Sequence, residues 1–324
     1  MTKPSVSVVV CTVDRGHFLY FVMQAISQLR SSIQELIVVV GPTQDNTRAI
    51  VTNYKNVIDK VIYTKFRNVS IARNLGLKAT SQEIIVYLDD DVISSEQWIQ
   101  HHIKAHQQWG KHCGCVAGIV VDRTQISAPV QFARGVSSRL SESRPVLSPT
   151  TQQRYLAKSD WFAAAMGANA SYKREALVEI GGFDEFFEYF LEETDICLRL
   201  LEAGYETRFL DVAVDHYVQP SHNRRDRVHL TCWYSLAKNT TYFALKHRTR
   251  SLFAPMFWLR LARLLIYRCG LRILRLKWTH GLPYGVLWEY LRLAGVGVRD
   301  GMRSGFALNH QLNCLPKYSC KFKL

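Results

Sequence analysis

The sequence predicts an α/β fold with a mostly parallel central sheet flanked by helices, and two observations support this prediction. Over about the first 110 residues, short apolar runs rich in Val and Ile alternate with segments of helical length. Strands that alternate with helices form parallel sheets, because each helix carries the chain back across one face of the sheet. The second observation is that the apolar run 84–88 ends in three consecutive carboxylates, Asp89, Asp90 and Asp91. In open sheets of this kind, ligands bind at the carboxyl ends of the strands.

The individual elements follow from the apolar period and from helix-terminating residues. In the first part of the chain, we expect strands at 6–12, 35–41, 57–64 and 83–88, and helices at 17–30, 46–54, 68–80 and from about 95. In the second part, we expect strands at 113–122, 160–172 and 205–214, and helices at 173–180 and 192–203. The segment 123–158 is rich in Ser, Pro, Arg and Thr and lacks a clear period, so we expect a long functional or mobile loop there.

The last third of the chain differs from the rest in charge. Residues 1–221 carry 22 Lys and Arg against 24 Asp and Glu, whereas residues 222–324 carry 19 Lys and Arg against three acids. Such a basic region predicts an anionic partner, which could be a membrane surface, a nucleic acid or a phosphorylated acceptor.

Two helices are expected in this basic region, at 228–247 and 252–278. On a helical wheel, the second helix carries an apolar stripe made of Ala262, Leu265, Ile266, Cys269, Ile273 and Leu276. Its far side carries Arg260, Arg268, Arg272 and Arg275. This pattern suits a helix that lies in an anionic membrane interface, although a helix packed on the rest of the protein would show the same pattern. No apolar stretch reaches the roughly 18–20 residues that a spanning helix needs.

The eight cysteines and the N-terminus bear on the cellular compartment. The cysteines are scattered without a CxxC pair, and the chain begins with an expected strand rather than a signal peptide. We therefore expect a reducing, cytoplasmic compartment. Together with the basic helix, this predicts a peripheral position on the inner face of the cell membrane.

The three carboxylates at 89–91 carry the clearest chemical prediction. Adjacent carboxylates repel one another unless a cation or hydrogen-bond donors neutralise them. Mg²⁺ and Mn²⁺ are held by one or two carboxylates together with substrate phosphates. The tripeptide therefore predicts a metal–diphosphate site, although a solvated acidic turn that caps the next helix would have the same sequence.

Six motifs together resemble the family 2 glycosyltransferases, which have the nucleotide-sugar (GT-A) fold, and are most similar to the rhamnosyltransferase-like members. The motifs are VSVVVCTVDR, IARNLGLKAT, IVYLDDD, MGANASYKREALVEIGGFDE, LEETDICLRLLEAGY and the DHY of VAVDHYV. They occur in the family's order and cover roughly residues 5–220. The resemblance implies a GT-A catalytic domain at 1–221, with a nucleotide-binding half at about 1–122 and an acceptor half at about 123–221. The basic helical region at 222–324 would follow it.

The resemblance also implies which residues bind the donor and the metal. The residues matched on the nucleotide-sugar side are Thr12, Asp14, Arg15, Asp45, Arg73, Asp89 and Asp90. Asp91, with Asp89 and His216, would hold Mn²⁺ or Mg²⁺, which would neutralise the diphosphate leaving group. The family's usual acidic run after the second strand is reduced here to Asp45, so the choice among UDP, dTDP and GDP donors stays open.

The catalytic base is expected at the start of the helix 192–203. By resemblance, the base is the second acid of an acidic pair, which here is Glu192-Glu193, so Glu193 matches. The family usually has Asp at this position, and Asp195 therefore stays a second candidate. A single base that takes the proton of the acceptor hydroxyl implies direct displacement with inversion at the sugar carbon.

The acceptor side is expected to be formed by small residues and aromatic rings. By resemblance, the acceptor-side residues are Trp161, Gly167, Asn169, Gly182 and Phe183. Small residues allow the backbone to approach a sugar, although close packing of a strand and a helix would also need them.

The sequence therefore predicts an inverting, metal-dependent glycosyltransferase that extends a glycan or lipid-linked acceptor, within cell-surface polysaccharide synthesis. A sugar-nucleotide pyrophosphorylase is the enzymatic alternative, but its glycine-rich loop is missing after the first strand. A non-enzymatic basic protein that binds lipid or nucleic acid would leave the acids at 89–91 and 192–195 unexplained. We therefore expect no nucleic-acid partner.

Overall fold

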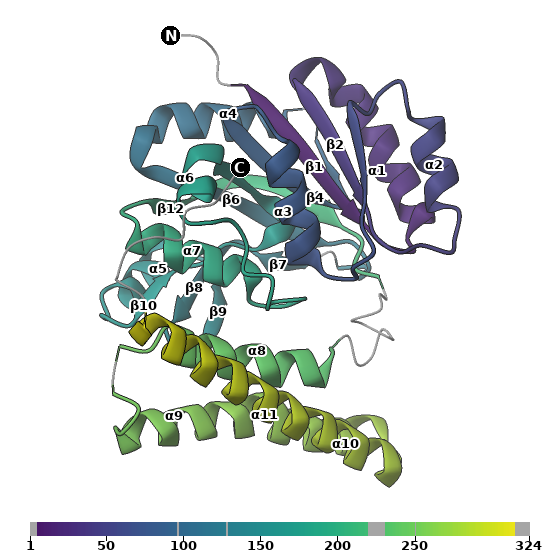
Figure 1. Cartoon of the computed structure of the whole chain (residues 1–324). Coiled ribbons are helices and arrows are strands. Elements are labelled where there is room, and N and C mark those ends of the chain that lie inside the picture. The colour runs from purple at the N-terminus through teal and green to yellow at the C-terminus, as the bar shows by residue number, and fades with distance from the viewer. Residues whose placement is uncertain (1–4, 96, 128, 220–230, 250, 315–324) are drawn as a thin grey trace.

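The computed structural model describes residues 5–95, 97–127, 129–219, 231–249 and 251–314. Figure 1 shows a central sheet covered by helices and, below it, a separate layer of C-terminal helices.

The central sheet has the strand order β3-β2-β1-β4-β11-β6-β12-β5 within the described residues. Its strands are β1 (Val6–Thr12), β2 (Glu35–Val40), β3 (Lys60–Tyr63), β4 (Ile84–Asp89), β5 (Val92–Ser94), β6 (Cys113–Asp122), β11 (Ala170–Lys173) and β12 (Glu206–His216). A further strand, β7 (Val130–Phe132), pairs with β6. The first four strands are parallel, whereas β11 enters antiparallel between β4 and β6. The predicted α/β class, with a largely parallel first half of the sheet, is confirmed.

Helices cover both faces of this sheet, which explains why its first strands are apolar throughout. The helices are α1 (Gly16–Leu29), α2 (Thr47–Asn53), α3 (Val69–Ala79), α4 (Trp98–Trp109), α6 (Arg174–Glu179) and α7 (Glu192–Glu202). Along β1, Val8 and Val10 belong to one core with α1 and α4, and Val9 belongs to the other core with α3 and α7. Successive side chains of a strand point to opposite faces, so both sets are buried.

The neighbouring strands β1 and β4 end at the same edge of the sheet. Cys11 is paired with Asp89 in the parallel register of these strands. The residues that follow each strand, from Thr12 on one and from Asp90 on the other, therefore lie beside each other. This register brings two of the sequence motifs into one site.

The expectation of a long loop at 123–158 is wrong. This segment contains β7, β8 (Arg134–Ser138), β9 (Ser143–Val146) and α5 (Pro149–Leu156). The strands β8 and β9 form a three-stranded sheet with β10 (Trp161–Ala163). Its strands are short and rich in Ser and Arg, and Ser137 and Ser138 are buried, so the apolar alternation that marks a strand is missing.

The expected strand 160–172 is divided into two strands that lie in different sheets. β10 belongs to the small sheet, the turn of 3₁₀ helix Gly167–Asn169 follows, and β11 belongs to the central sheet. The chain therefore crosses from one sheet to the other at Gly167, which faces the pocket described below.

The C-terminal layer consists of helices packed on the part of the protein that contains the central sheet. They are α8 (Trp233–Lys246), α9 (Pro255–Leu265), the π-helical segment η4 (Ile266–Leu271), α10 (Arg272–His280) and α11 (Tyr284–Cys314). The first residues of the expected helix 228–247 lie outside the described residues. Helix α11 was not predicted. It packs closely on α8 at Gly297 and Gly301, where a Cβ would lie 2.4 Å from the backbone of α8.

Among the described helices, none is both long enough and apolar enough to cross a bilayer.

The apolar stripe expected on 252–278 does not form one exposed face. Cys269 and Ile273 are buried in a core that α8 and α11 complete. Arg268, expected on the polar side, turns inward and donates to the Ser141 carbonyl oxygen at 2.7 Å. The π-helical segment has more residues in each turn than an α-helix, so the 100° wheel loses its phase here. The side of these helices that faces outward is consequently different from the expected one.

Candidate active site

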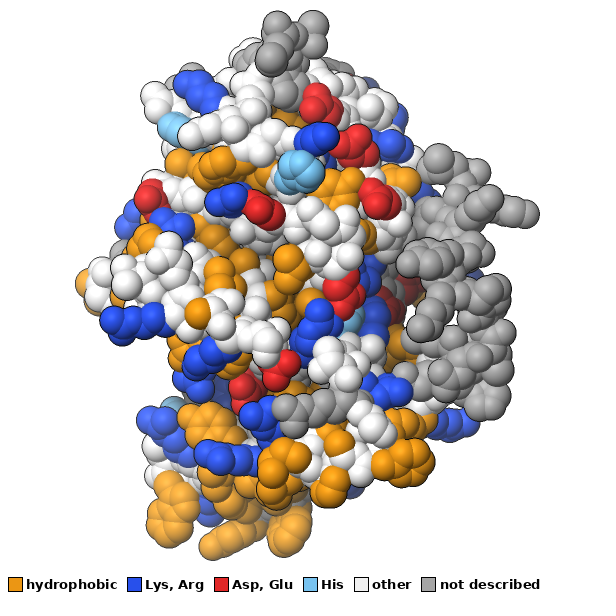
Figure 2. Space-filling view, turned by 90° about the vertical axis from the view of Figure 1, so that its left-hand side faces the viewer, with side chains coloured by type: hydrophobic (Ala, Val, Ile, Leu, Met, Phe, Trp, Pro, Cys, Tyr) orange, Lys and Arg blue, Asp and Glu red, His pale blue; other side chains and the backbone are white. Residues whose placement is uncertain are grey.

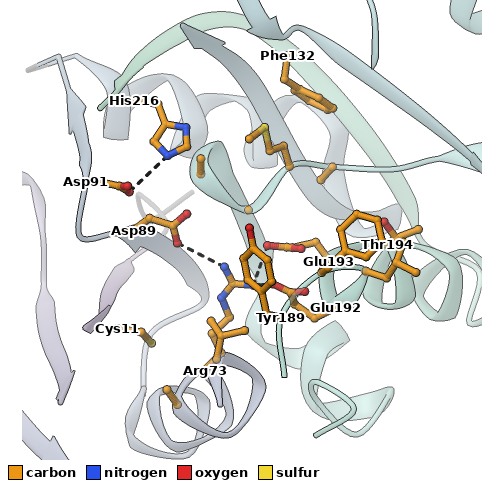
Figure 3. A pocket seen from close by; sticks show the side chains of 18 of the residues that line it. Cys11, Arg73, Asp89, Asp91, Phe132, Tyr189, Glu192, Glu193, Thr194 and His216 are labelled. Atoms are coloured by element: carbon orange, nitrogen blue, oxygen red, sulfur yellow. Dashed lines mark hydrogen bonds and ion pairs between the residues drawn. The ribbon is translucent and has the colours of Figure 1, made fainter. Parts of the chain in front are cut away.

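One pocket of about 480 Å³ lies at the carboxyl ends of β1 and β4, between the central sheet and the start of α7. Figure 3 shows acids from β4 and from α7 on its opposite sides, with Arg73 between them. The predicted site residues that line the pocket are Thr12, Arg15, Arg73, Asp89, Asp90, Asp91, Gly167, Glu192, Glu193 and His216. These residues are far apart in the sequence, and the sheet topology brings them together.

The acids that follow β4 have different surroundings. Asp90 is buried, accepts a hydrogen bond from the Thr12 hydroxyl at 2.7 Å and pairs with Arg15 at 3.2 Å. Burial raises the pKa of Asp90 to about 7 in spite of Arg15. Asp91 is also buried, yet His216 and Arg15 lower its pKa. Asp89 is more exposed and faces the pocket.

The geometry of Asp91 and His216 fits a divalent cation in part. The Nδ1 atom of His216 is bonded to the Gln131 side chain at 2.8 Å, and its Nε2 atom lies 3.4 Å from Asp91 Oδ1. Within the described chain, this Nε2 atom is buried and makes no hydrogen bond. A buried nitrogen and a carboxylate that point at the same place are suitable metal ligands.

Two protein ligands do not complete a metal site. Across the residues with a described position, no group of three or more His, Cys, Asp or Glu side chains is arranged to hold a metal. Magnesium is commonly bound by one or two carboxylates, substrate phosphates and water. The residues present therefore fit a cation that would obtain its remaining ligands from a bound diphosphate.

Arg73, on α3, joins the two acidic sides of the pocket. One guanidinium nitrogen lies 2.8 Å from Glu193 Oε1, and the other lies 3.4 Å from Asp89 Oδ1. The guanidinium is buried and lies over the rings of Tyr87 and Phe183. Burial opposes the charge, but the nearby acids, Glu193 above all, raise the pKa of Arg73. The side chain therefore stays charged and orients both acids.

Glu192 and Glu193 differ although they are neighbours at the start of α7. Glu192 is buried, and burial together with the adjacent Glu193 raises its pKa well above the usual value. Glu193 lies on the pocket wall and makes the shorter contact with Arg73. Of the two acids, Glu193 is therefore the one that both faces the cavity and makes the closer contact with the Arg73 guanidinium.

Gly167 is in close contact with this pair. A Cβ atom at this position would lie 2.0 Å from Glu193 Oε1 and 2.8 Å from an Arg73 nitrogen. No side chain can therefore be placed here without moving one of these groups.

The structure does not bring Asp195 to the pocket. Asp195 is fully buried, and its oxygens lie 2.7 Å from Arg199, 2.6 Å from Lys246 and 2.8 Å from His247. Burial opposes ionisation, but Arg199 and Lys246 lower the pKa of Asp195 well below its usual value. This carboxylate ties α7 to α8 and is not placed to take a proton from a substrate.

Several other expected residues have structural contacts instead of lining the pocket. Asp45 accepts bonds from the backbone N–H groups of Gly16 and Thr47. Burial raises its pKa, but these bonds and those from the Thr43 and Thr47 hydroxyls lower it to about 2. Asp14 is paired with Arg67 at 2.5 Å.

Most of the residues expected on the acceptor side also lie away from the pocket. Asn169 is buried behind the pocket, where it bonds Trp98 and His102. Gly182 has a φ of +69°, and Phe183 is buried beneath Arg73. Trp161 belongs to a second, smaller cavity near Phe257 and Arg260. Of the five acceptor-side residues, Gly167 alone faces the pocket.

Other pocket residues were not predicted from the sequence. They include Gln131 and Phe132 of β7, Arg144 of β9, Met166, and Tyr189 in the segment before α7. Most belong to segments that were expected to be loop or that carry no motif. Nothing in their local sequence indicates a ligand, because their positions depend on how the strands pair: β7 pairs with β6 in the central sheet, and β9 pairs with β8 in the small sheet.

Among solved structures, the fold is similar to that of the mannosyltransferase PcManGT from Pyrobaculum calidifontis, determined in complex with GDP-Man and Mn²⁺. The TM-score is 0.56 at 16% sequence identity, and the match covers 92% of this chain and 88% of that one. The fold is thus that of the GT-A glycosyltransferases.

The family model for glycosyl transferase family 2 matches residues 7–181. The chain therefore belongs to glycosyl transferase family 2, as its motifs predicted, and not to the sugar-nucleotide pyrophosphorylases.

Two curated relatives are similar in sequence. A glucosyl-dolichyl phosphate glucuronosyltransferase from Haloferax volcanii is 22% identical over 222 residues, which are 62% of this chain and 64% of the relative. A pre-mycofactocin glycosyltransferase from Mycobacterium tuberculosis is 30% identical over 158 residues, which are 46% of this chain and 30% of the relative. The chain thus spans less than two thirds of the length of either protein.

Proposed function

We propose that this chain is an inverting, divalent-metal-dependent glycosyltransferase. It moves a sugar from a nucleotide-sugar donor to a hydroxyl group of a glycan or lipid-linked acceptor in cell-surface polysaccharide synthesis. The observation that carries this proposal is the position of Arg73, which contacts Asp89 at the strand end and Glu193 across the pocket. A donor-binding edge and a carboxylate base thereby face the same cavity.

On the donor side, Thr12, Arg15 and Asp89 to Asp91 would hold the nucleotide and its diphosphate. Asp91 and His216 would bind the metal, and the bound Mn²⁺ or Mg²⁺ would supply positive charge to the leaving diphosphate. Asp89, expected as a further ligand, is not grouped with them and contacts Arg73 instead. Gln131 fixes the tautomer and the orientation of His216 through its Nδ1 atom.

On the acceptor side, Glu193 would take the proton of the attacking hydroxyl group. The hydroxyl oxygen forms a bond to the anomeric carbon, the bond from that carbon to the diphosphate breaks, and a nucleoside diphosphate leaves. Arg73 and Gly167 hold the Glu193 carboxylate in position. A single displacement supported by one base inverts the configuration of the sugar carbon.

Each part of the chain is assigned one step of this proposed function. We assign the transfer reaction to 1–221, with donor binding in 1–122 and acceptor binding in 123–221, and assign membrane association to 222–324. The name of the Haloferax relative, a glucosyl-dolichyl phosphate glucuronosyltransferase, supports a lipid-linked acceptor. A lipid-linked acceptor and a basic C-terminal layer agree with a peripheral position on the inner face of the cell membrane.

Calorimetry with UDP, dTDP and GDP, each with and without Mn²⁺, tests the donor side. We expect one nucleotide to bind in a metal-dependent manner and Asp91→Asn to lose this binding. Tyr63→Ser, on the far edge strand β3, is a control that should bind like the wild type. A folded protein that binds none of the nucleotides, or an Asp91→Asn variant that binds normally, would contradict the proposed site.

A further inference from the structure

The helices α9, η4 and α10 and the start of α11 carry large apolar side chains that contact solvent. We call this surface the outer apolar face; its residues are Phe253, Leu259, Ile266, Tyr267, Leu271, Leu274, Trp278, Tyr284 and Trp288. Trp278 is 86% exposed, Tyr267 is 72% exposed and Trp288 is 67% exposed. Figure 2 shows apolar side chains gathered at the lower end of the molecule, next to Lys and Arg.

Of the residues in the stripe that the helical wheel predicted, this face contains Ile266 alone. The opposite side of the same helices already packs on the protein, through Phe257, Leu261, Cys269 and Ile273. The segment is therefore apolar on both sides, and its outer side has no partner within the described residues. Contiguous apolar surface of this kind marks an interaction site in soluble proteins.

The charge around the outer apolar face indicates the partner. Residues 251–288 contain six Lys and Arg and no Asp or Glu. Arg268 turns inward, whereas Arg263 and Arg275 are exposed. A second copy of this chain would bring the same positive charge against itself. Anionic lipid headgroups neutralise it, and the Trp and Tyr rings suit the boundary between headgroups and acyl chains.

We propose that the outer apolar face docks on the surface of an anionic lipid bilayer, with α9 and α10 lying parallel to the membrane plane. The outer apolar face would be the surface that holds the protein at the membrane. That this docking serves sugar transfer rests on the proposed function. The apolar rings enter the interface, and the exposed arginines contact the headgroups.

The position of the pocket gives this docking a consequence for the acceptor. Phe190, which lines the pocket, lies under the guanidinium of Arg268 of η4, at 5.6 Å. This pocket wall is therefore in contact with the helical layer whose other side is the outer apolar face. The pocket thus adjoins the layer that would dock on the membrane, which favours a lipid-linked acceptor over a free glycan.

Vesicle flotation of the full chain tests the proposal. We compare vesicles of phosphatidylcholine alone with vesicles that contain 30% phosphatidylglycerol, because anionic lipids attract a basic protein surface. The wild type should float with the anionic vesicles. Trp278→Ser combined with Trp288→Ser should reduce the bound fraction at least tenfold, because two interfacial anchors are lost. Arg263→Gln combined with Arg275→Gln should weaken binding roughly 30-fold to anionic vesicles alone.

Tyr63→Ser is the matched control, since Tyr63 is an exposed aromatic residue (52%) on β3. All variants change exposed side chains, and thermal unfolding checks that they fold. Nucleotide binding by calorimetry should be the same in the membrane variants, so a failure of docking is distinguished from a failure of the donor site. Vesicle binding that the Trp variants retain would overturn the proposal. So would a dimer, detected by light scattering, that the Trp variants lose, because it would show a second copy as the partner.

Discussion

Gly167 contacts both groups that carry the proposed chemistry, at the point where the chain passes from the small sheet to the central sheet. Its hydrogen atoms face Glu193 Oε1 and an Arg73 nitrogen, and a Cβ would approach them to 2.0 and 2.8 Å. The absence of a side chain here is thus part of how Glu193, the proposed base, is positioned.

We predict that Gly167→Ala lowers kcat by roughly a hundredfold, because a displacement of about 1 Å at a reacting group has an effect of this size. Metal-dependent nucleotide binding should change little, since the donor edge lies on the other side of the pocket. Steady-state kinetics and calorimetry measure the two effects. Gly295→Ala is the control, because a Cβ at Gly295 meets nothing within 4 Å. A Gly167→Ala enzyme with the wild-type kcat would show that Glu193 is not the base or is not held here.

Glu193 and Asp195 lie two positions apart on α7, and helical geometry turns their side chains in nearly opposite directions. Glu193 faces the pocket, whereas Asp195 is buried against α8.

We predict that Glu193→Gln lowers kcat by about 10²–10⁴ at unchanged nucleotide binding. Asp195→Asn should instead lower the free energy of unfolding by about 3–5 kcal/mol, because it leaves Lys246 and Arg199 with an incomplete buried ion pair.

Transfer kinetics and urea unfolding of both variants separate these roles. A stable Asp195→Asn protein without transfer activity would return the base to Asp195.

Helix α8 holds the segment that leads into the N-terminal end of α7. Asn239 donates to the Tyr189 carbonyl at 2.7 Å and to the Phe190 carbonyl at 2.9 Å. Phe190 and Leu191 both have positive φ, at 77° and 75°. Non-glycine residues occupy this conformation only where neighbouring contacts impose it. The C-terminal layer thus determines the conformation of the backbone just before Glu192.

We predict that Asn239→Ala lowers kcat together with stability, because two buried carbonyl oxygens lose their donor at about 1–3 kcal/mol each. Thr241→Ala is the matched control, since the Thr241 hydroxyl bonds within α8, to the Ala237 carbonyl. The control should lose some stability without a change in kcat. Equal kcat values for the two variants would show that α8 only stabilises the fold.

The helical layer also shows where local patterns fail. The helix 252–278 was predicted, but its inner and outer faces were not, because a π-helical segment changes the phase of the wheel. Gly297 and Gly301 are four residues apart on α11 and lie against α8. This spacing is visible in the sequence and could have indicated a closely packed helix.

The pH dependence of the free energy of unfolding should come in part from two buried histidines of α4. Burial lowers the pKa of His102 to about 4 and that of His106 to about 3. Both stay neutral in the folded protein, whereas the unfolded chain takes up protons below about pH 6.5. Their contribution to stability is therefore present above pH 6.5 and is lost as the pH falls from 6.5 toward 4.

We predict that urea unfolding at pH 5.0–7.5 shows this loss of stability, at up to about 1.4 kcal/mol per pH unit for each histidine. In His106→Gln, the pH dependence should be weaker by the contribution of one histidine. Gln is chosen because its amide can replace the hydrogen bond of His106 to the Ser171 hydroxyl. An unchanged slope in the variant would show that His106 titrates normally in the folded protein.

Most elements of residues 1–122 were predicted from the sequence to within a few residues, because strand and helix periods are local properties; the short strand β5 was not. The three acids that end β4 were visible for the same reason, since they are adjacent in the chain and follow an apolar run. Recognition of the family rested on motifs of this local kind.

The tertiary structure decided which of these residues meet. Arg73 reaches Glu193 across 120 positions of sequence, and His216 is oriented by Gln131 across 85. Whether Asp195 faces substrate or α8, and which side of α9 and α10 faces outward, depends on what packs against each helix. A local pattern specifies the faces of an element, but contacts between distant residues determine which face is buried and which one meets a ligand.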